Sequence, residues 1–192
     1  MGVLRQWRER LLVKRIRSGD RQAAEQLVDE HYQNVYRWLL HLCRHREHAA
    51  DLTQETFVQV WDGLDGFRGQ ASLKTWIHRI AYHAYLRTQR NPTSEPQPLS
   101  EVSDIAGPDI AEVALTGHLV HEALARLPEK QRDVVVLHYL HGLTAAEVAG
   151  VLQIPTGTVL SRLHTSRATL RELLSDESSP SEQEVQTDVA QE

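Results

Sequence analysis

The chain has little of what stabilises small secreted proteins or holds proteins in membranes. Its 192 residues include one cysteine, Cys43, so no intrachain disulfide can form and a reducing compartment is expected. No apolar run approaches the roughly 20 residues that span a bilayer, so we expect no stable membrane insertion. The first residues are basic but lack the apolar core of a secretory signal. These absences predict a cytoplasmic protein.

Alternating runs of β-branched residues are also scarce, which argues against a sheet. Apolar residues instead recur at helical spacing through the first 90 residues, so we expect an all-α protein. Gly19 and Asp20 predict the end of one helix and the cap of the next, which runs to about His31. A following helix carries Val35, and another is expected from His48 to Trp61.

Basic residues are missing from two segments. Residues 1–90 carry 15 Lys or Arg and 10 Asp or Glu, whereas no Lys or Arg lies between Arg90 and Arg126 or after Arg171. The net charge of −5 therefore hides basic blocks that suit a phosphate-binding surface. We expect four parts: a helical domain at 1–90, an extended acidic Pro-rich linker at 91–111, a second helical domain at 112–174 and a disordered acidic tail at 175–192.

The stretch 127–174 has the pattern of three helices, the last two joined by a tight turn. Gly142 ends the first of them, and Thr144 with Glu147 is the signature of a capping box at the start of the second. A four-residue connection, Gln153–Thr156, leads to the third. Apolar or small residues share one face of that helix: Val159, Leu163, Ser166 and Leu170. This layout is a helix-turn-helix, whose last helix enters the major groove of DNA.

Two stretches together carry a family resemblance. They read HAADLTQETFVQVWDGLDGFRGQASLKTWIHRIAYH and LPEKQRDVVVLHYLHGLTAAEVAGVLQIPTGTVLSRLH, and the acidic linker separates them. In this order and at this spacing they resemble bacterial sigma factors of the sigma-70 family, extracytoplasmic-function (group 4) type, over roughly residues 10–174. The resemblance implies an alternative sigma factor. Its sigma region 2-like and region 4-like domains would bind core RNA polymerase, recognise the −10 and −35 promoter elements and direct transcription initiation.

The resemblance also implies contact residues for each partner. Those for core polymerase are Asp51, Gln54, Glu55 and Gln59. Those for the −10 element, in a glycine-rich loop and the helix after it, are Phe67, Arg68, Gly69, Lys74 and His83. Those for the −35 element are Thr156, Gly157, Thr158, Ser161, Arg162, His164 and Arg167. Glycines let backbone approach a strand, and stacking on an aromatic ring is worth about 1–3 kcal/mol per base. Phe67 has core packing as an open alternative.

Several positions depart from the family pattern. Leu160 and Thr165 stand where basic residues are common, which predicts weaker phosphate attraction at the −35 element. His83 stands where asparagine is common in the −10 base pocket, and its imidazole lacks the paired donor and acceptor of a carboxamide. Arg87 replaces a frequent acid. Gln153 stands where glycine is usual in the turn, so a left-handed conformation is expected there.

Functions of other classes stay open at this point. A repressor using only the helix-turn-helix would bind duplex DNA without polymerase. A metal-sensing regulator is a weak candidate, on four residues that could ligate a metal if the helix continues: His41, Cys43, His45 and His48. An enzyme is not expected, because no nucleophile, phosphate loop or metal set accompanies Asp51 and Glu55. No cofactor and no small-molecule substrate are expected.

The family resemblance implies one further partner. Sigma factors of this type are often held inactive by an anti-sigma factor that covers the polymerase-binding surface, so an anti-sigma partner is expected here. An active factor is expected at the nucleoid, bound to polymerase and promoter DNA.

Overall fold

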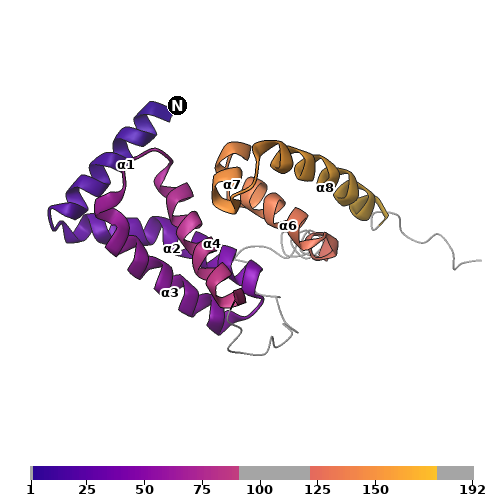
Figure 1. The fold of residues 1–192 in the computed structure, drawn as a ribbon, viewed down its shortest axis with the longest axis horizontal. Coiled ribbons are helices and arrows are strands. Elements are labelled where there is room, and N and C mark those ends of the chain that lie inside the picture. Colours follow the sequence, from indigo (N-terminus) through magenta and orange to yellow (C-terminus); the bar gives the residue numbers. More distant parts are fainter. Residues whose placement is uncertain (1, 91–121, 177–192) are drawn as a thin grey trace, which may run out of the picture.

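The protein is built from helices alone over the part of the chain that the computed structural model describes, residues 2–90 and 122–176. Side chains are described from Leu4 to Arg90 and from Glu122 to Leu174. Figure 1 shows the helices in two groups, one from each described range. The all-α prediction is therefore confirmed for these residues. All of the predicted linker and most of the predicted tail lie outside them.

The first domain consists of four helices around one core. Its elements are α1 (Gly2–Arg17), α2 (Arg21–Cys43), α3 (Arg46–Gly63), a 3₁₀ turn (Leu64–Gly66) and α4 (Leu73–Arg90). The core holds large side chains that water does not reach, among them Leu27, Trp38, Leu39, Val60, Leu73 and Ile77. Helix α3 packs between α2 and α4, which fixes the faces that α3 and α4 leave to solvent.

Local signals explain where these helices begin and end. Gly19 adopts a positive φ of 85°, and the Asp20 side chain accepts a hydrogen bond from Ala23 N at 3.1 Å, as the sequence predicts. The prediction of a break after His31 was wrong: α2 continues as one helix to Cys43. No glycine or proline interrupts residues 31–35, so buried packing of the whole α2 face prevails over the weak helix propensity of this stretch.

The second domain contains the helix-turn-helix. Residues 122–126 are helical and are followed by α6 (Glu129–Val135), a π-helical turn (Val136–Leu140), α7 (Ala145–Leu152) and α8 (Thr156–Asp176). The predicted α7 is confirmed at both ends. The predicted inward face of α8 is confirmed as well, since Val159, Leu163 and Ser166 are buried and Leu170 packs against the same core. The connection is one residue shorter than predicted, because Thr156 already belongs to α8.

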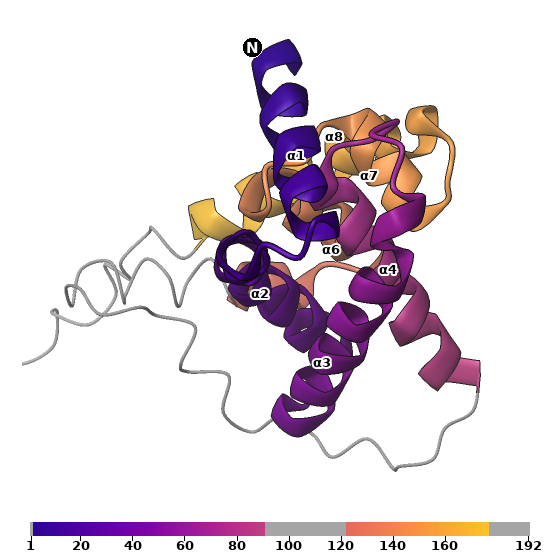
Figure 2. The same cartoon turned by 90° about the vertical axis from the view of Figure 1, so that its left-hand side faces the viewer.

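The two domains pack against each other along α4 and α7. This is the most extensive contact between them, and Figure 2 shows the two helices side by side. Among the described residues, no helix is both long and apolar enough to cross a bilayer. The arrangement places the start of α4 directly beside the start of α7, which matters for the site below.

Candidate nucleic-acid and polymerase interfaces

The helix-turn-helix is fixed by two local devices that the sequence predicts. Thr144 caps α7 and Glu147 caps Thr144 in return: Thr144 N donates to the Glu147 carboxylate at 2.9 Å, and Glu147 N donates to Thr144 Oγ1 at 3.3 Å. Gln153 then adopts the left-handed conformation, with φ 55° and ψ 43°. Only glycine adopts this without steric cost, so the turn holds a strained residue between its two helices.

The first turns of α8 present most of the residues predicted to read the −35 element. Thr156, Gly157, Ser161, His164 and Arg167 are exposed, and two more are half-buried: Thr158 and Arg162. The start of a helix carries free amides and a partial positive charge, which suits a DNA phosphate. The structure thus brings the predicted −35 residues together on one open surface.

Two positions on α8 leave that surface short of cations. Leu160 is 55% exposed, an unusual setting for leucine, and Thr165 is exposed five residues further along the helix. Arg162, which could reach DNA, donates to the carbonyl of Lys130 at 3.4 Å and so leans back toward α6. The surface is therefore polar, with few charges to attract phosphate.

The predicted polymerase-binding residues lie along one side of α3. Asp51, Gln54 and Glu55 are exposed, and Gln59 is half-buried. Glu55 accepts hydrogen bonds from Gln59 Nε2 at 2.9 Å and from Arg87 of α4 at 2.6 Å. Arg87, the residue that departs from the family pattern, thus holds part of this face.

The loop between α3 and α4 is tied to α1 by an arginine that sequence reasoning missed. Arg17 donates to three carbonyls of the loop, those of Leu64 at 2.7 Å, Asp65 at 2.8 Å and Phe67 at 3.1 Å. Gly69 has a φ of +69°, and a Cβ there would lie 3.0 Å from Arg10 Nε. No sequence motif marks Arg17, because its contacts reach residues about 50 positions away.

Two aromatic residues, Phe67 of this loop and Trp76 of α4, pack against each other. Phe67 is buried, with 8% of its surface exposed, and its ring lies 5.2 Å from that of Trp76 at a tilt of 53°. The ring therefore offers no free face to an unpaired base in this conformation. Packing against Trp76 corresponds to the core alternative for Phe67. Arg68 is exposed next to it, and Gly69 is buried.

The two remaining −10 residues contact the second domain. The Lys74 ammonium donates to the carbonyl of His141, and burial lowers the Lys74 pKa, with Arg5 adding to the effect. His83 Nε2 accepts from the Gln153 side-chain amide at 3.2 Å. Sequence reasoning placed these residues near DNA and could not foresee partners that lie about 70 positions along the chain.

The carboxylate of Glu147 links the two domains by hydrogen bonds near Lys74. The Glu147 carboxylate that caps α7 also accepts from Ser72 Oγ at 2.9 Å and from Thr75 Oγ1 at 2.8 Å, both at the start of α4. Partial burial opposes ionisation of Glu147, but the hydrogen bonds from Thr144, Thr75 and Ser72 outweigh it and lower its pKa. The group is therefore an anion at neutral pH.

Two histidines meet at the centre of the contact. The His78 ring of α4 and the His141 ring lie 5.1 Å apart, and Trp38 lies 6.1 Å from His141. Burial lowers the pKa of His78 to about 3 and that of His141 to about 4, with nearby cations such as Lys74 adding to the effect. His78 Nε2 and His141 Nδ1 have no hydrogen-bond partner among the described residues. Both rings are neutral at pH 7.

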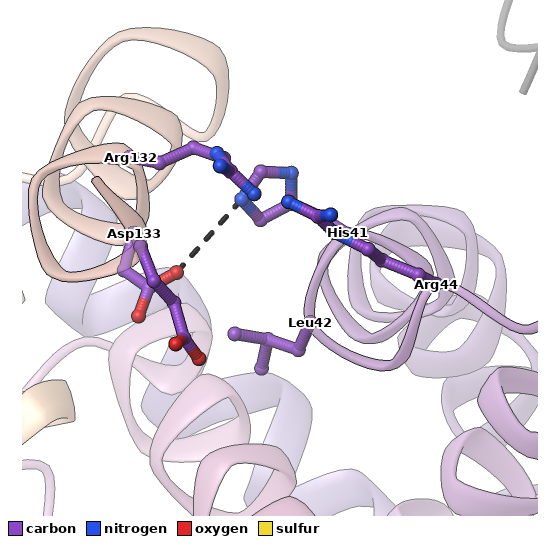
Figure 3. Close-up of a pocket in the computed structure, with 6 residues that line it drawn as sticks. His41, Leu42, Arg44, Arg132 and Asp133 are labelled. Carbon is purple, nitrogen blue, oxygen red and sulfur yellow. Dashed lines mark ion pairs between the residues drawn. The ribbon is translucent and has the colours of Figure 1, made fainter. Parts of the chain in front are cut away.

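A pocket of about 260 Å³ lies at the other end of the boundary between the domains. Figure 3 shows His41 from α2 pointing across it toward Asp133 of α6, with the two side chains 3.8 Å apart. Burial raises the pKa of Asp133 to about 7, and the neighbouring Glu129 adds to the rise. The pocket is lined mainly by polar and charged side chains, from the end of α2 and from α6.

The weak metal candidate does not keep the geometry that it needs. Helix α2 ends at Cys43, and His45 Nδ1 accepts from His48 N at 3.2 Å as the cap of α3. The helical spacing that would align His41 with His45 is therefore broken. Burial raises the pKa of Cys43 to about 12, which disfavours the thiolate that a metal prefers. The described residues contain no group of three or more His, Cys, Asp or Glu placed to hold a metal.

Comparisons with known proteins agree with this architecture. The family model "Sigma-70 region 2" matches residues 27–93, and "Sigma-70, region 4" matches residues 118–170. The RNA polymerase sigma-H factor of Pseudomonas aeruginosa is 30% identical over 189 residues, covering 90% of this chain and 96% of its own. The extracytoplasmic-function (ECF) sigma factor SigM of Mycobacterium tuberculosis is 35% identical over 158 residues, covering 82% of this chain and 80% of its own.

A solved structure shares the fold over nearly the whole chain. CnrH, solved in complex with the cytosolic domain of CnrY, superposes with a TM-score of 0.64 at 25% identity, covering 88% of this chain and 99% of CnrH. The sigma factor RpoE of Bartonella quintana, solved with the anti-sigma factor NepR, has a TM-score of 0.60 at 21% identity. The chain belongs to the sigma-70 family of RNA polymerase sigma factors and is of the extracytoplasmic-function type.

Proposed function

We propose that this sigma factor directs transcription initiation through three surfaces, each on a different helix. The first turns of α8 read the −35 element, the loop after α3 with the start of α4 reads the −10 element, and the polar side of α3 binds core polymerase. The observation that carries the proposal is the exposure of the α8 start at the open end of the helix-turn-helix.

At the −35 element, the polar residues of α8 contact base edges and phosphates in the major groove. Ser161 and Thr158 can donate or accept at several bases, whereas Arg162 and Arg167 supply charge. Since Leu160 and Thr165 contribute none, this surface alone binds duplex weakly. Specific binding then depends on the simultaneous −10 and polymerase contacts, because linked contacts raise the effective concentration of each other.

At the −10 element, the first domain holds the separated strand. Arg68 is exposed in the loop and Arg17 fixes the carbonyls of Leu64 and Phe67 just before it, so the loop meets DNA with a preset shape. Lys74 and His83 lie along the next helix and complete the surface once they are free of the second domain. Unpairing a base costs a few kcal/mol, which contacts of the strand with this surface offset.

On the polymerase side, the exposed acids and amides of α3 bind core polymerase. Glu55 and Asp51 supply the charges that steer association, and Arg87 sets the position of Glu55. The protein itself performs no catalytic step, and when active it resides with polymerase at the nucleoid. The predicted linker at 91–111 lies outside the described residues and is expected to run through basic parts of the polymerase.

An anti-sigma factor controls the protein in this proposal. The similar protein CnrH is described in complex with the cytosolic domain of CnrY, and RpoE with an anti-sigma factor. The ECF class of this chain and the match over 88% of its length to CnrH support a partner of that kind.

Run-off transcription tests the function directly. Core RNA polymerase, this protein and fragmented genomic DNA are combined, and the transcripts are mapped. Specific start sites that share two upstream elements are expected only when both proteins are present. Tight duplex binding without core, together with no initiation when core is added, would instead identify a repressor.

A further inference from the structure

Helix α1 has two apolar faces, and the rest of the described chain covers only one of them. Leu12 and Val13 are buried in the core of the first domain. Leu4, Trp7 and Leu11 are instead 75%, 62% and 43% exposed. Single exposed apolar residues are common, whereas a group of them on one element marks a surface for a partner.

The three exposed side chains form one stripe along the helix. An α-helix turns by about 100° per residue, so positions 4, 7 and 11 fall within about 60° of one another. Leu12, Val13 and Ile16, which pack against the core, lie roughly on the opposite side. Figures 1 and 2 show the first turns of α1 projecting beyond the rest of the first domain. The stripe therefore faces away from the protein.

Cations border this stripe on both sides. The same helical spacing places Arg8 and Arg15 along one edge and Arg10 and Lys14 along the other, and all four are exposed. Over its whole length α1 carries six Lys or Arg and one acid, Glu9. The side chains of Arg8 and Lys14 make no hydrogen bond or ion pair with any other residue in the described ranges. One cation on each edge is therefore free to attract an external anion.

An apolar stripe between two rows of cations matches a bilayer surface that carries anionic lipids. A helix of this kind lies in the plane of the interface, with its apolar side chains among the upper acyl chains and its Lys and Arg at the lipid phosphates. Tryptophan is favoured at this depth, because its ring is apolar and its N–H can meet the headgroups. Three apolar side chains bury little area, so binding needs the cations as well.

Two other occupants match the surface less well. Nucleic acid would attract the cations, but it would leave the apolar stripe facing a row of phosphates. A second copy of this chain would cover the stripe, but it would bring the cations of two α1 helices together, and like charges repel. A bilayer with anionic headgroups satisfies the stripe and the cations at once.

From this arrangement we propose that α1 docks on the surface of a bilayer containing anionic lipids, through Leu4, Trp7 and Leu11 and the cations that border them. The helix lies in the interface and does not cross it. The inference goes beyond promoter reading, because the stripe contains none of the residues assigned to polymerase, the −10 element or the −35 element. The association is weak and sensitive to salt, since charge supplies part of the attraction.

Sedimentation of the full-length protein with vesicles tests the proposal. One set of vesicles contains equal parts of phosphatidylglycerol and phosphatidylcholine, and the other contains phosphatidylcholine alone. The parent should bind the anionic vesicles, release them as salt is raised, and bind the neutral vesicles little. Leu4→Gln with Trp7→Gln removes two stripe residues, and Arg8→Gln with Lys14→Gln removes two bordering cations. Each pair should weaken binding to anionic vesicles at least fivefold.

Matched controls change the same kinds of residue elsewhere. Leu140→Gln replaces an exposed leucine of the second domain. Arg79→Gln with Lys130→Gln removes two exposed cations, one from α4 and one from α6. Both controls should bind anionic vesicles as the parent does. Glutamine is a good helix former, and circular dichroism checks that the helix content of every variant is unchanged.

Several results would overturn the proposal. Failure of the parent to bind anionic vesicles would do so directly. Equal binding by the parent and the Leu4→Gln, Trp7→Gln pair would also do so, because charge alone would then explain the attraction. A parent dimer in analytical ultracentrifugation that the same pair dissociates would assign the stripe to a second copy. Stronger binding of α1 to a random DNA duplex than to vesicles, lost in the Arg8→Gln, Lys14→Gln pair, would assign the surface to nucleic acid.

Discussion

The Glu55 carboxylate of α3 accepts a hydrogen bond from the Arg87 guanidinium of α4 at 2.6 Å. Both side chains are about half exposed, at 48% and 52%, so the pair adds under about 1 kcal/mol to stability. The pair matters because it fixes the position of Glu55, an acid of the proposed polymerase-binding face, relative to α4.

Glu55→Gln should weaken binding of core polymerase about tenfold, because it removes a charge that attracts the partner. The free energy of unfolding should change by less than about 1 kcal/mol. Titration of labelled protein with core polymerase measures the affinity. Asp29→Asn removes an exposed charge from α2, away from the proposed α3 face, and serves as the control. Equal affinities for the two variants would exclude Glu55 from the interface.

Arg17→Met should loosen the loop before α4, because three carbonyls lose their shared donor. Hydrogen bonds to a charged group are worth about 1.5–3 kcal/mol. Arg17 is partly exposed, so we expect the free energy of unfolding, measured in urea, to fall by roughly 1–2 kcal/mol. Run-off transcription should fall more than core binding does. Arg21→Met, which removes an exposed ion pair with Glu25, should leave both unchanged.

Leu160→Arg should strengthen binding to duplex DNA and steepen its salt dependence. One added phosphate contact changes the slope of log affinity against log salt by about 0.9. Fluorescence anisotropy of a −35 duplex at several salt concentrations measures both effects. Val58→Arg adds the same charge at an exposed apolar position of α3 and should have little effect. Unchanged affinity of Leu160→Arg at all salt concentrations would place Leu160 away from the phosphates.

Acid should destabilise the packing of the two domains through His78 and His141. Their folded pKa values, about 3 and about 4, lie below the ordinary 6.5, so the unfolded or separated state takes up protons first. Their contribution is fully present above pH 6.5 and is lost as pH falls toward 4. At pH 5, keeping each ring neutral in the folded protein lowers the free energy of unfolding by about 2 kcal/mol. Lys74 lowers the pKa of both rings further, and Arg37 and His41 lower that of His141.

Urea unfolding at pH 7 and pH 5 measures this loss, and His141→Gln should show a smaller one. Asp133 acts in the opposite sense. Burial raises its pKa to about 7, so Asp133 takes up a proton more readily in the folded protein, and this adds to the free energy of unfolding as pH falls. Because Asp133 is present in both proteins, its contribution cancels in the comparison. An equal loss in the parent and in His141→Gln would remove His141 from the acid response.

The sequence predicts the helix-turn-helix well because its signals are local. Thr144 and Glu147 are three residues apart and together cap the start of α7. Gln153 adopts the left-handed conformation that the turn requires. The α3 face is equally accessible to prediction, since Asp51 and Glu55 lie on one side of a continuous helix. These features depend on neighbours within one or two turns.

Long-range contacts escape prediction for the opposite reason. The bonds from Arg17 to the loop and from Lys74 to His141 join residues about 50 to 70 positions apart. Nothing near Phe67 indicates that its ring is covered by Trp76. The π-helical turn, marked by a bond from His141 N to the carbonyl of Val136 at 3.0 Å, orients His141 and has no sequence signature. The packing of the two domains against each other is therefore visible only in the structure.

Permanganate reactivity of thymines at a mapped start site tests the central claim most directly. Polymerase core with this protein should expose unpaired thymines in the −10 region, and Lys74→Ala should reduce that reactivity several-fold while duplex contacts at −35 remain. Neither core alone nor this protein alone should expose them. Unreactive thymines with both proteins present, alongside −35 protection by this protein alone, would contradict the account of a two-site promoter reader.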